Sequence, residues 1–358
     1  MEIKVTPAAP DRLKPKPTDE SKLGFGSIFT DHMFLMEYED GKGWFNPRIE
    51  PYRALDLDPA ALGIHYAQVV FEGLKAYYGA DGEIYLFRAG ENLKRLNNSA
   101  PRICMPQVDA EVVREGMKRL IWLDREWIPK SPGTSLYIRP TMIASEAHLS
   151  VRPSKHHLFY IIIGPVGAYY KEGLNPVKIY VEDQYVRTAP GGTGATKTAG
   201  NYAGSLLAAE EAKEKGFTQV LWLDAVERNY IEEVGTMNMF FVIEDEVITA
   251  PLDGCILPGI TRDSVIEIVK DWGIKMTERS LSIDEVTQAA KNDRLKEAFG
   301  TGTAAVISPV GEIAYKGEDI VVAGGKMGDL SRRLYDEIVA IQYAEKEDPY
   351  NWREVIRY

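Results

Sequence analysis

Lys197 is the residue whose surroundings in the sequence best suit covalent chemistry. It lies in the glycine-rich segment GGTGATKTAGNY. Glycine lets the backbone approach a ligand closely, and a lysine partly removed from water can act as an amine nucleophile. The simpler interpretation is a surface-loop lysine, the usual situation of this residue type. A phosphate-binding P-loop is a weak alternative, because that motif needs glycine directly before the lysine and Thr196 occupies this place.

Two adjacent carboxylates, Glu232 and Glu233, precede an apolar segment in YIEEVGTMNMF. Neighbouring residues on a strand point to opposite faces, so one carboxylate can face a pocket while the other faces water. A buried carboxylate needs a cation beside it, and the protonated ring nitrogen of a pyridine cofactor would serve. We therefore expect one carboxylate at a site and the other in solvent.

Three further segments offer groups that bind anions. CILPGITRDS leads from a Pro-Gly turn into a predicted helix, whose N-terminus can hold a phosphate, although a plain helix start capped by Thr261 is the simpler interpretation. FGTGTAAVIS presents small residues with hydrogen-bond donors. Arg95 is either a phosphate clamp or a solvated helix arginine. No segment is specific alone, but with Lys197 and a carboxylate they supply everything that pyridoxal phosphate requires.

The elements that must position these residues alternate between strands and helices, which predicts a mixed α/β fold. Asp81-Gly82 and the pair Gly41 and Gly43 mark hairpin turns. The clearest helix is 201–216, for which Leu206, Leu207 and Ala209 would supply the apolar positions and Gly216 the stop. Other predicted helices cover 90–99, 109–122 (N-capped by Asp109), 261–272 and 330–345. Predicted strands cover 135–145, 156–170, 177–187, 217–224 and 237–243.

The length of 358 residues suits two domains. The sequence texture changes near residues 171–190, where loop segments bracket a single strand signal. We therefore predict a small N-terminal α/β domain with an extended arm at 1–171, a connection at 172–189, and a large C-terminal α/β domain at 190–358 that carries Lys197.

Composition restricts the partners. The net charge of −11 argues against nucleic acid as the main partner, because phosphate binding needs a basic face. Two cysteines form no disulfide framework, and the five histidines show no metal-ligand spacing, so we expect no metal and a reducing, cytoplasmic location. The N-terminus does not resemble a signal peptide, and the most apolar stretch, 158–166, is too short to span a bilayer.

Taken together, long motifs make the chain resemble the branched-chain amino acid aminotransferases, which are fold-type IV enzymes dependent on pyridoxal phosphate. The resemblance covers nearly the whole chain. It runs through FTDHMFLMEY, IHYAQVVFEGLKAY, LYIRP, GPVGAYY, GGTGATKTAGNY, EEVGTMNMFF, LDGCILPGITRDS and FGTGTAAVISPV.

The resemblance implies a role for each matching residue. Lys197 would form the covalent bond to the cofactor and then move the proton, and Glu233 would pair with the pyridine nitrogen. The other cofactor-binding positions would be Arg95, Arg187, Tyr202, Thr236, Ile260, Thr261 and Thr303. The substrate α-carboxylate would meet the backbone of Thr303 and Ala304, and Arg139 would meet the distal carboxylate of 2-oxoglutarate. The apolar pocket would be formed by Phe25, Phe71, Tyr137 and Tyr169, with Tyr66, Leu149 and Val151 reaching in from the neighbouring subunit of a homodimer.

The implied reaction transfers the amino group of leucine, isoleucine or valine to 2-oxoglutarate in two half-reactions, so the partners would be small amino acids and 2-oxo acids. Animal members carry a Cys-x-x-Cys pair where this chain has Ala305 and Ser308, so no thiol switch is expected there. Alternatives of the same fold are a D-amino acid aminotransferase and an aminodeoxychorismate lyase. A nucleotide- or NAD-linked enzyme is disfavoured because no G-x-G-x-x-G follows an early strand, and a non-catalytic binding module is a third class.

Overall fold

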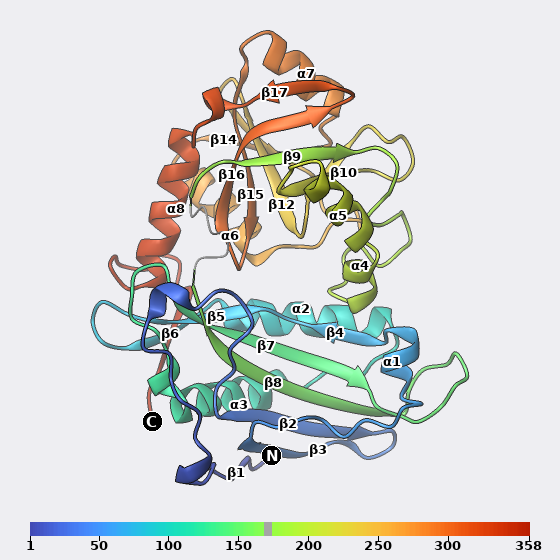
Figure 1. Ribbon diagram of the computed structural model, residues 1–358, viewed down its shortest axis with the longest axis vertical. Helices are drawn as coiled ribbons and strands as arrows, with labels where there is room; N and C mark the ends of the chain where they lie inside the picture. The colour runs from blue at the N-terminus through green and yellow to red at the C-terminus, as the bar shows by residue number, and fades with distance from the viewer. Residues whose placement is uncertain (168–173) are drawn as a thin grey trace. The chain divides into compact units, whose positions relative to one another are not determined.

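The computed structural model describes residues 1–167 and 174–358, which form two compact units (Figure 1). The first unit takes its described residues from Met1–Tyr169, Thr196–Ala199 and Ala340–Tyr358, and the second from Tyr170–Ala195 and Gly200–Val339. The sequence placed everything after 190 in the second domain. The structure instead groups the C-terminal stretch with the first unit, because its last strand pairs with a strand of that unit.

The first unit is built on one large sheet with the strand order β1-β3-β2-β8-β7-β5-β6-β18, and β4 pairs with β7 beside this path. Apart from the parallel β1–β3 pair, the printed pairings in this sheet are antiparallel. Both predicted hairpins are confirmed, and Gly41, Gly43 and Gly82 have the positive φ angles that tight turns need. The strands are β1 (Lys4–Val5), β2 (His32–Glu39), β3 (Gly43–Pro51), β4 (Val69–Phe71), β5 (Leu74–Tyr78), β6 (Ile84–Phe87), β7 (Ser135–Ala144), β8 (His156–Val166) and β18 (Arg353–Ile356).

Two helices of this unit, α2 (Ala89–Arg102) and α3 (Ala110–Leu123), pack against each other and cover the sheet, α3 over β2 and β3. The side chain of Asp109 accepts hydrogen bonds from the first-turn amides of α3, so the predicted N-cap is confirmed. Apolar residues of α2, α3 and the covered sheet face form one buried core. A short helix, α1 (Leu62–Tyr66), and the 3-10 turns Pro10–Arg12, Glu20–Lys22 and Arg125–Trp127 complete the unit.

The second unit contains a sheet that closes on itself. Its path is β11-β10-β9-β16-β15-β12-β13-β14, and β11 also pairs with β12, so six strands form a ring. Closure removes the free edges that an open sheet would leave at β11 and β12. The strands are β9 (Val177–Glu182), β10 (Gln219–Leu223), β11 (Ile231–Val234), β12 (Met237–Ile243), β13 (Glu246–Thr249), β14 (Lys275–Glu278), β15 (Leu295–Gly302), β16 (Val306–Tyr315) and β17 (Glu318–Val321).

The helix predicted for 201–216 differs from the structure. Two shorter helices, α4 (Ala199–Ala203) and α5 (Leu206–Glu214), take its place. The expectation that Leu206 and Leu207 face the core is wrong, since they are 63% and 56% exposed. Ala208 and Ala212 are the residues that pack inward, because a helix so close to the sheet leaves room for small side chains. The predicted stop is confirmed, since Gly216 has a φ of +87°.

The remaining helices are α6 (Ile260–Asp271), α7 (Ile283–Lys291), α8 (Asp329–Gln342) and the 3-10 turn Ala323–Gly325. α6 and α8 lie close to the predicted bounds. Among the residues that the structure describes, no helix is long and apolar enough to cross a membrane. The same residues contain no cluster of histidine, cysteine or carboxylate side chains suited to a metal ion.

Candidate active site

One buried stripe of α2 organises the charged residues of the first unit. Asn92, Arg95 and Ser99 follow each other at helical spacing and are all buried. The Arg95 guanidinium makes a two-pronged contact with Glu72, in which Nε lies 2.7 Å from Oε1 and Nη2 lies 2.8 Å from Oε2. Asn92 Nδ2 donates to the same Oε2 over 2.8 Å. Arg95 is therefore no solvated helix arginine, and its direction is fixed by a buried carboxylate.

The backbone of Lys197 is held by the same stripe. Its amide donates to Ser99 Oγ over 3.0 Å, and its carbonyl accepts from the amide of Phe71 over 3.1 Å. The next residue, Thr198, forms a bridge with Val70 and donates through its hydroxyl to the Val69 carbonyl over 2.8 Å. The Lys197 ammonium lies 5.1 Å from the centre of the Phe71 ring. The residue thus occupies a fixed, half-buried position, and the surface-loop interpretation does not describe it.

An aromatic wall with one cation stands beside this lysine in the same unit. The rings of Phe25 and Tyr137 meet edge to face at 4.9 Å. The Arg139 guanidinium lies 4.8 Å from the Phe71 ring centre and donates from Nη2 to the Tyr137 hydroxyl over 2.8 Å. Gly73 makes room for this hydroxyl, because a Cβ there would come within 2.2 Å of it. The structure therefore brings four predicted substrate residues together with Lys197.

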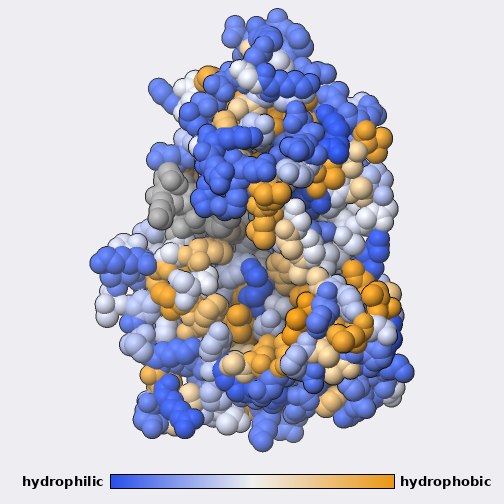
Figure 2. Space-filling view, turned by 45° about the vertical axis from the view of Figure 1, so that its right-hand side comes forward, coloured by the Kyte–Doolittle hydropathy of each residue, from blue (hydrophilic) through white to orange (hydrophobic). Residues whose placement is uncertain are grey.

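The residues predicted to serve a neighbouring subunit lie on the surface. Val151 is 83% exposed, Leu149 and Tyr66 are exposed as well, and the Tyr66 hydroxyl donates to the Leu149 carbonyl. Figure 2 shows apolar patches among hydrophilic side chains on one face of the molecule. The fourth predicted pocket aromatic, Tyr169, lies outside the described residues.

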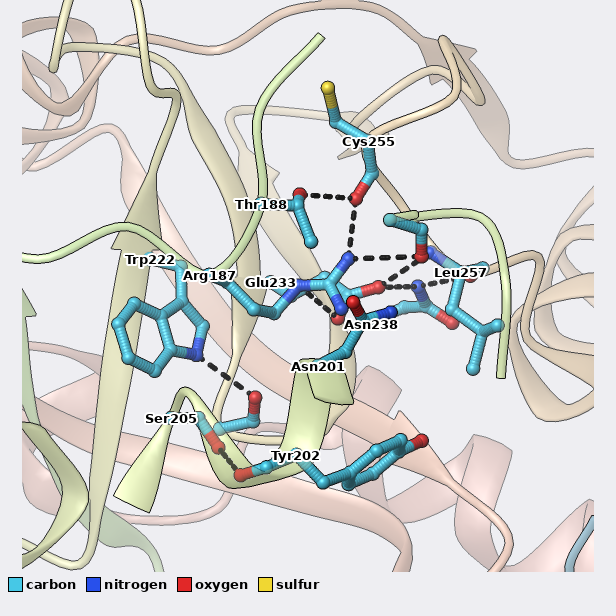
Figure 3. A network of polar contacts seen from close by, with 12 residues as sticks. Arg187, Thr188, Asn201, Tyr202, Ser205, Trp222, Glu233, Asn238, Cys255 and Leu257 are labelled. Carbon is cyan, nitrogen blue, oxygen red and sulfur yellow. Dashed lines mark hydrogen bonds and ion pairs between the residues drawn. The ribbon is translucent and has the colours of Figure 1, made fainter. Parts of the chain in front are cut away.

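The second unit centres on Glu233, which β11 places in the interior of the strand ring (Figure 3). Its Oε1 accepts from the Leu257 amide over 2.8 Å and from Asn238 Nδ2 over 3.2 Å. Its Oε2 forms an ion pair with Arg187 Nε at 3.0 Å. Arg187 in turn donates from Nη2 to the Cys255 carbonyl. These donors hold a buried carboxylate in its anionic form.

Glu232 corrects the expectation that one of the two carboxylates faces water. It is only 5% exposed, because β11 has a paired strand on both sides and is buried along its whole length. Burial raises the pKa of the Glu232 carboxyl to about 8, against the opposing effect of Arg187. Within the described chain, its Oε2 has no hydrogen-bond partner. Two adjacent glutamates therefore differ in charge near neutral pH.

The N-terminus of α6 suits a phosphate. Gly259 stands at the N-cap, where glycine offers no side-chain oxygen to cover the first-turn amides of Ile260 and Thr261. A Cβ at Gly259 would come within 1.9 Å of Asn238 Oδ1, so only glycine fits against the residue that also supports Glu233. The predicted cap by Thr261 is wrong, since the helix begins one residue before it.

The remaining predicted residues of the second unit lie in turns or short helices. Tyr202 is part of α4, and its carbonyl accepts from the Ser205 hydroxyl over 2.8 Å. Thr236 is exposed in the tight turn between β11 and β12, while Thr303 and Ala304 occupy the turn between β15 and β16. The roles given to these residues stay predictions.

Two residues of these networks were missed by sequence reasoning. Glu72 is fully buried and binds Arg95, and Asn238 supports both Glu233 and the chain at Leu257. A charge inside the apolar segment VVFEGLKAY was the available signal for Glu72. No comparable signal marked Asn238.

Comparison with known proteins decides the family. The family model described as amino-transferase class IV matches residues 69–313, which contain both charged networks. The chain belongs to the class IV aminotransferases. Branched-chain-amino-acid aminotransferase 2 of Bacillus subtilis (strain 168) is 55% identical to it over 339 residues, covering 95% of this chain and 93% of that protein.

Solved structures agree with this placement of the class IV aminotransferase. The branched-chain amino acid aminotransferase of Escherichia coli is 27% identical with a TM-score of 0.75, covering 91% of this chain and 99% of that one. The enzyme from T.th., solved with pyridoxamine 5'-phosphate, is 26% identical with a TM-score of 0.74, covering 90% and 98%. The predicted mixed α/β, fold-type IV architecture is therefore confirmed.

Proposed function

We propose that this enzyme transfers the amino group of L-leucine, L-isoleucine or L-valine to 2-oxoglutarate, with pyridoxal phosphate as cofactor. The observation that carries the proposal is the aromatic wall of Phe25, Phe71 and Tyr137 beside Lys197, with Arg139 as its cation. The identity to aminotransferases named for branched-chain amino acids supports the same substrate class.

The residues present fit pyridoxal phosphate. Lys197 supplies the amine, and Glu233 is a buried anion suited to a protonated ring nitrogen. Arg95 and the α6 N-terminus beginning at Ile260 are donors suited to a phosphate group. When bound, this cofactor supplies an electron-withdrawing ring that stabilises negative charge at the substrate Cα.

The protein's own residues then have distinct tasks. The Lys197 amine takes the proton from the substrate Cα and returns it, which positioned side chains do with accelerations of about 10²- to 10⁴-fold. Glu233 keeps a proton on the ring nitrogen, and Arg187 keeps Glu233 in place. Tyr202 would contact the phenolic oxygen, Thr236 and Thr303 the cofactor region, and the Thr303 and Ala304 amides the α-carboxylate.

One pocket must accept both an apolar side chain and a carboxylate. Aromatic rings provide contact area for the branched side chain, and Arg139 provides the charge for the distal carboxylate of 2-oxoglutarate. A missing methylene in such a pocket costs only about 1–3 kcal/mol, so leucine, isoleucine and valine are all substrates with modest discrimination.

The proposal includes assembly as a homodimer in the cytoplasm. The exposed positions of Tyr66, Leu149 and Val151 support a surface that a second copy covers, since exposed apolar groups of this size favour association. Tyr169 is proposed to complete the pocket wall.

The test is an assay of the purified enzyme with 2-oxoglutarate and L-leucine, followed by the formation of glutamate. Parallel assays with D-alanine and with aminodeoxychorismate separate the two other activities of this fold. Turnover of L-leucine that exceeds both by at least about 10²-fold is expected, because those substrates do not match the aromatic wall. Faster turnover of either alternative substrate would overturn the proposal.

A further inference from the structure

We propose that Glu72 is a positioning residue that sets the Arg95 guanidinium for binding the cofactor phosphate. This inference rests on the proposed function, because it assumes that Arg95 meets that phosphate. Glu72 itself is assigned no contact with cofactor or substrate. It acts through Arg95, and its effect therefore depends on the phosphate group.

The geometry leaves Arg95 little freedom. Both prongs of the guanidinium edge formed by Nε and Nη2 are engaged by the Glu72 carboxylate at 2.7 and 2.8 Å. A planar guanidinium held along one edge cannot rotate, so the direction of its Nη1 group is fixed as well. A lone arginine at this position would lose side-chain entropy on binding an anion, whereas here that ordering is already complete.

The Glu72 carboxylate is itself fixed by its surroundings. Asn92 donates to it over 2.8 Å, and the Gly73 amide over 3.2 Å. Burial alone would raise the pKa of the Glu72 carboxyl, but Arg95 and Lys197 outweigh burial and hold the pKa below its ordinary value. The group therefore stays anionic at neutral pH and keeps its hold on Arg95.

A purely structural role would not call for this arrangement. Replacing a buried ion pair by apolar residues is often neutral or stabilising, so such a pair is weak evidence of a contribution to stability. The stripe that contains Arg95 also anchors the Lys197 amide through Ser99 at 3.0 Å. A fixed arginine and a fixed lysine on one helical face suit a ligand that carries both a phosphate and an aldehyde.

The experiment compares two aldehydes that differ in one group. The full-length chain, freed of cofactor by dialysis, is titrated with pyridoxal phosphate and with pyridoxal, and binding at Lys197 is followed by absorbance. In Glu72→Gln, affinity for pyridoxal phosphate should fall on the order of 10-fold, the usual effect of losing a charged hydrogen-bond partner. Affinity for pyridoxal should change by less than about 2-fold, since that ligand has no phosphate for Arg95.

Two further variants sharpen the result. Arg95→Ala should abolish most of the preference for the phosphorylated aldehyde, and adding Glu72→Gln to it should cause no further loss, because both act through one contact. Asp124→Asn is the matched control. It makes the same change at a buried carboxylate of the same unit, which binds His32 over 2.6 Å outside this network, and it should keep the wild-type preference.

Equal weakening of both aldehydes in Glu72→Gln would assign Glu72 a general structural role and overturn the proposal. A selective loss in Asp124→Asn would do the same. If Glu72→Gln does not fold, Glu72→Asp decides, since the shorter side chain cannot keep both contacts, and an unchanged preference would contradict the inference. Failure of the proposed function would look different, as a wild-type chain that neither prefers pyridoxal phosphate nor transaminates L-leucine.

Discussion

The two units each contain a buried arginine–glutamate pair, but the supports of the two pairs are reversed. In the first unit the carboxylate of Glu72 is surrounded by donors and holds Arg95 along one edge. In the second unit Glu233 receives a backbone amide and Asn238, while Arg187 is itself tied to the Cys255 carbonyl. The same two residue types therefore produce a fixed cation in one unit and a fixed anion in the other.

The difference shows how neighbouring groups decide what an ion pair can do. A guanidinium oriented by a carboxylate suits an anionic ligand group, and a carboxylate oriented by amides and a guanidinium suits a protonated nitrogen. Pyridoxal phosphate carries one group of each kind. The following predictions test whether the pairs work in this way.

The largest effect is expected at the lysine on which both assignments depend. Lys197→Ala should reduce transamination of L-leucine by at least about 10³-fold and abolish the visible absorbance of lysine-bound cofactor, because the proton-transferring amine is gone. Steady-state assays and a spectrum of the purified variant measure this. Lys213→Ala, at an exposed lysine of α5, is the control that should behave as wild type. Full activity without Lys197 would end the assignment.

The second prediction concerns the fixed anion. Glu233→Gln should lower kcat/KM for L-leucine by about 10²-fold, because the group that keeps a proton on the ring nitrogen becomes neutral. Glu232→Gln makes the identical change at the adjacent residue and should cost less than about 3-fold, since that carboxyl is already protonated at pH 7. Equal losses in the two variants would show that Glu233 has no special role.

A selective effect is expected at the cation of the aromatic wall. Arg139→Leu should raise KM for 2-oxoglutarate about 10-fold, the usual effect of losing a charged hydrogen bond, while the half-reaction with L-leucine stays within about 3-fold. Single-turnover measurements of the two half-reactions separate these effects. A similar loss for both substrates would mean that Arg139 acts on the pocket as a whole.

The smallest effect is a pH dependence of stability. The folded protein keeps the Glu232 proton up to its pKa of about 8, whereas the unfolded chain releases it near the ordinary value of 4.5. Unfolding therefore releases a proton between pH 5 and 8, and stability falls as pH rises, by at most roughly 1.4 kcal/mol per pH unit and less where water screens the carboxyl.

Glu232→Gln removes this contribution, so the difference in unfolding free energy between wild type and variant should decrease steadily from pH 5 to pH 8. Urea denaturation at pH 5, 6.5 and 8 measures it. A constant difference across this range would show that Glu232 is ionised in the folded protein.

The sequence predicted the helices and strands well where local signals were strong. Asp109, Gly82 and Gly216 mark a cap, a turn and a helix stop, and each does so through its own backbone chemistry. Lys197 was found from its glycine-rich neighbourhood, and the resemblance to a family brought together Phe25, Phe71, Tyr137 and Arg139, which the structure places side by side.

What the sequence did not predict depends on tertiary packing. The alternation rule placed Glu232 in water, but a strand inside a closed ring buries both of its faces. Helical periodicity gave Leu206 and Leu207 to the core, yet the sheet accepts only small residues there. The role of Glu72 follows from a contact 23 residues along the chain, which no local pattern encodes.

The chain enters the first unit three times, and the middle visit is the four residues Thr196–Ala199 around the reactive lysine. No single cut can therefore release either half with its sequence intact. A protease that nicked the polypeptide between the units would leave fragments that each lack a piece of their own fold. Engineering that exchanges one half between relatives would have to transplant this short loop and the last nineteen residues with it.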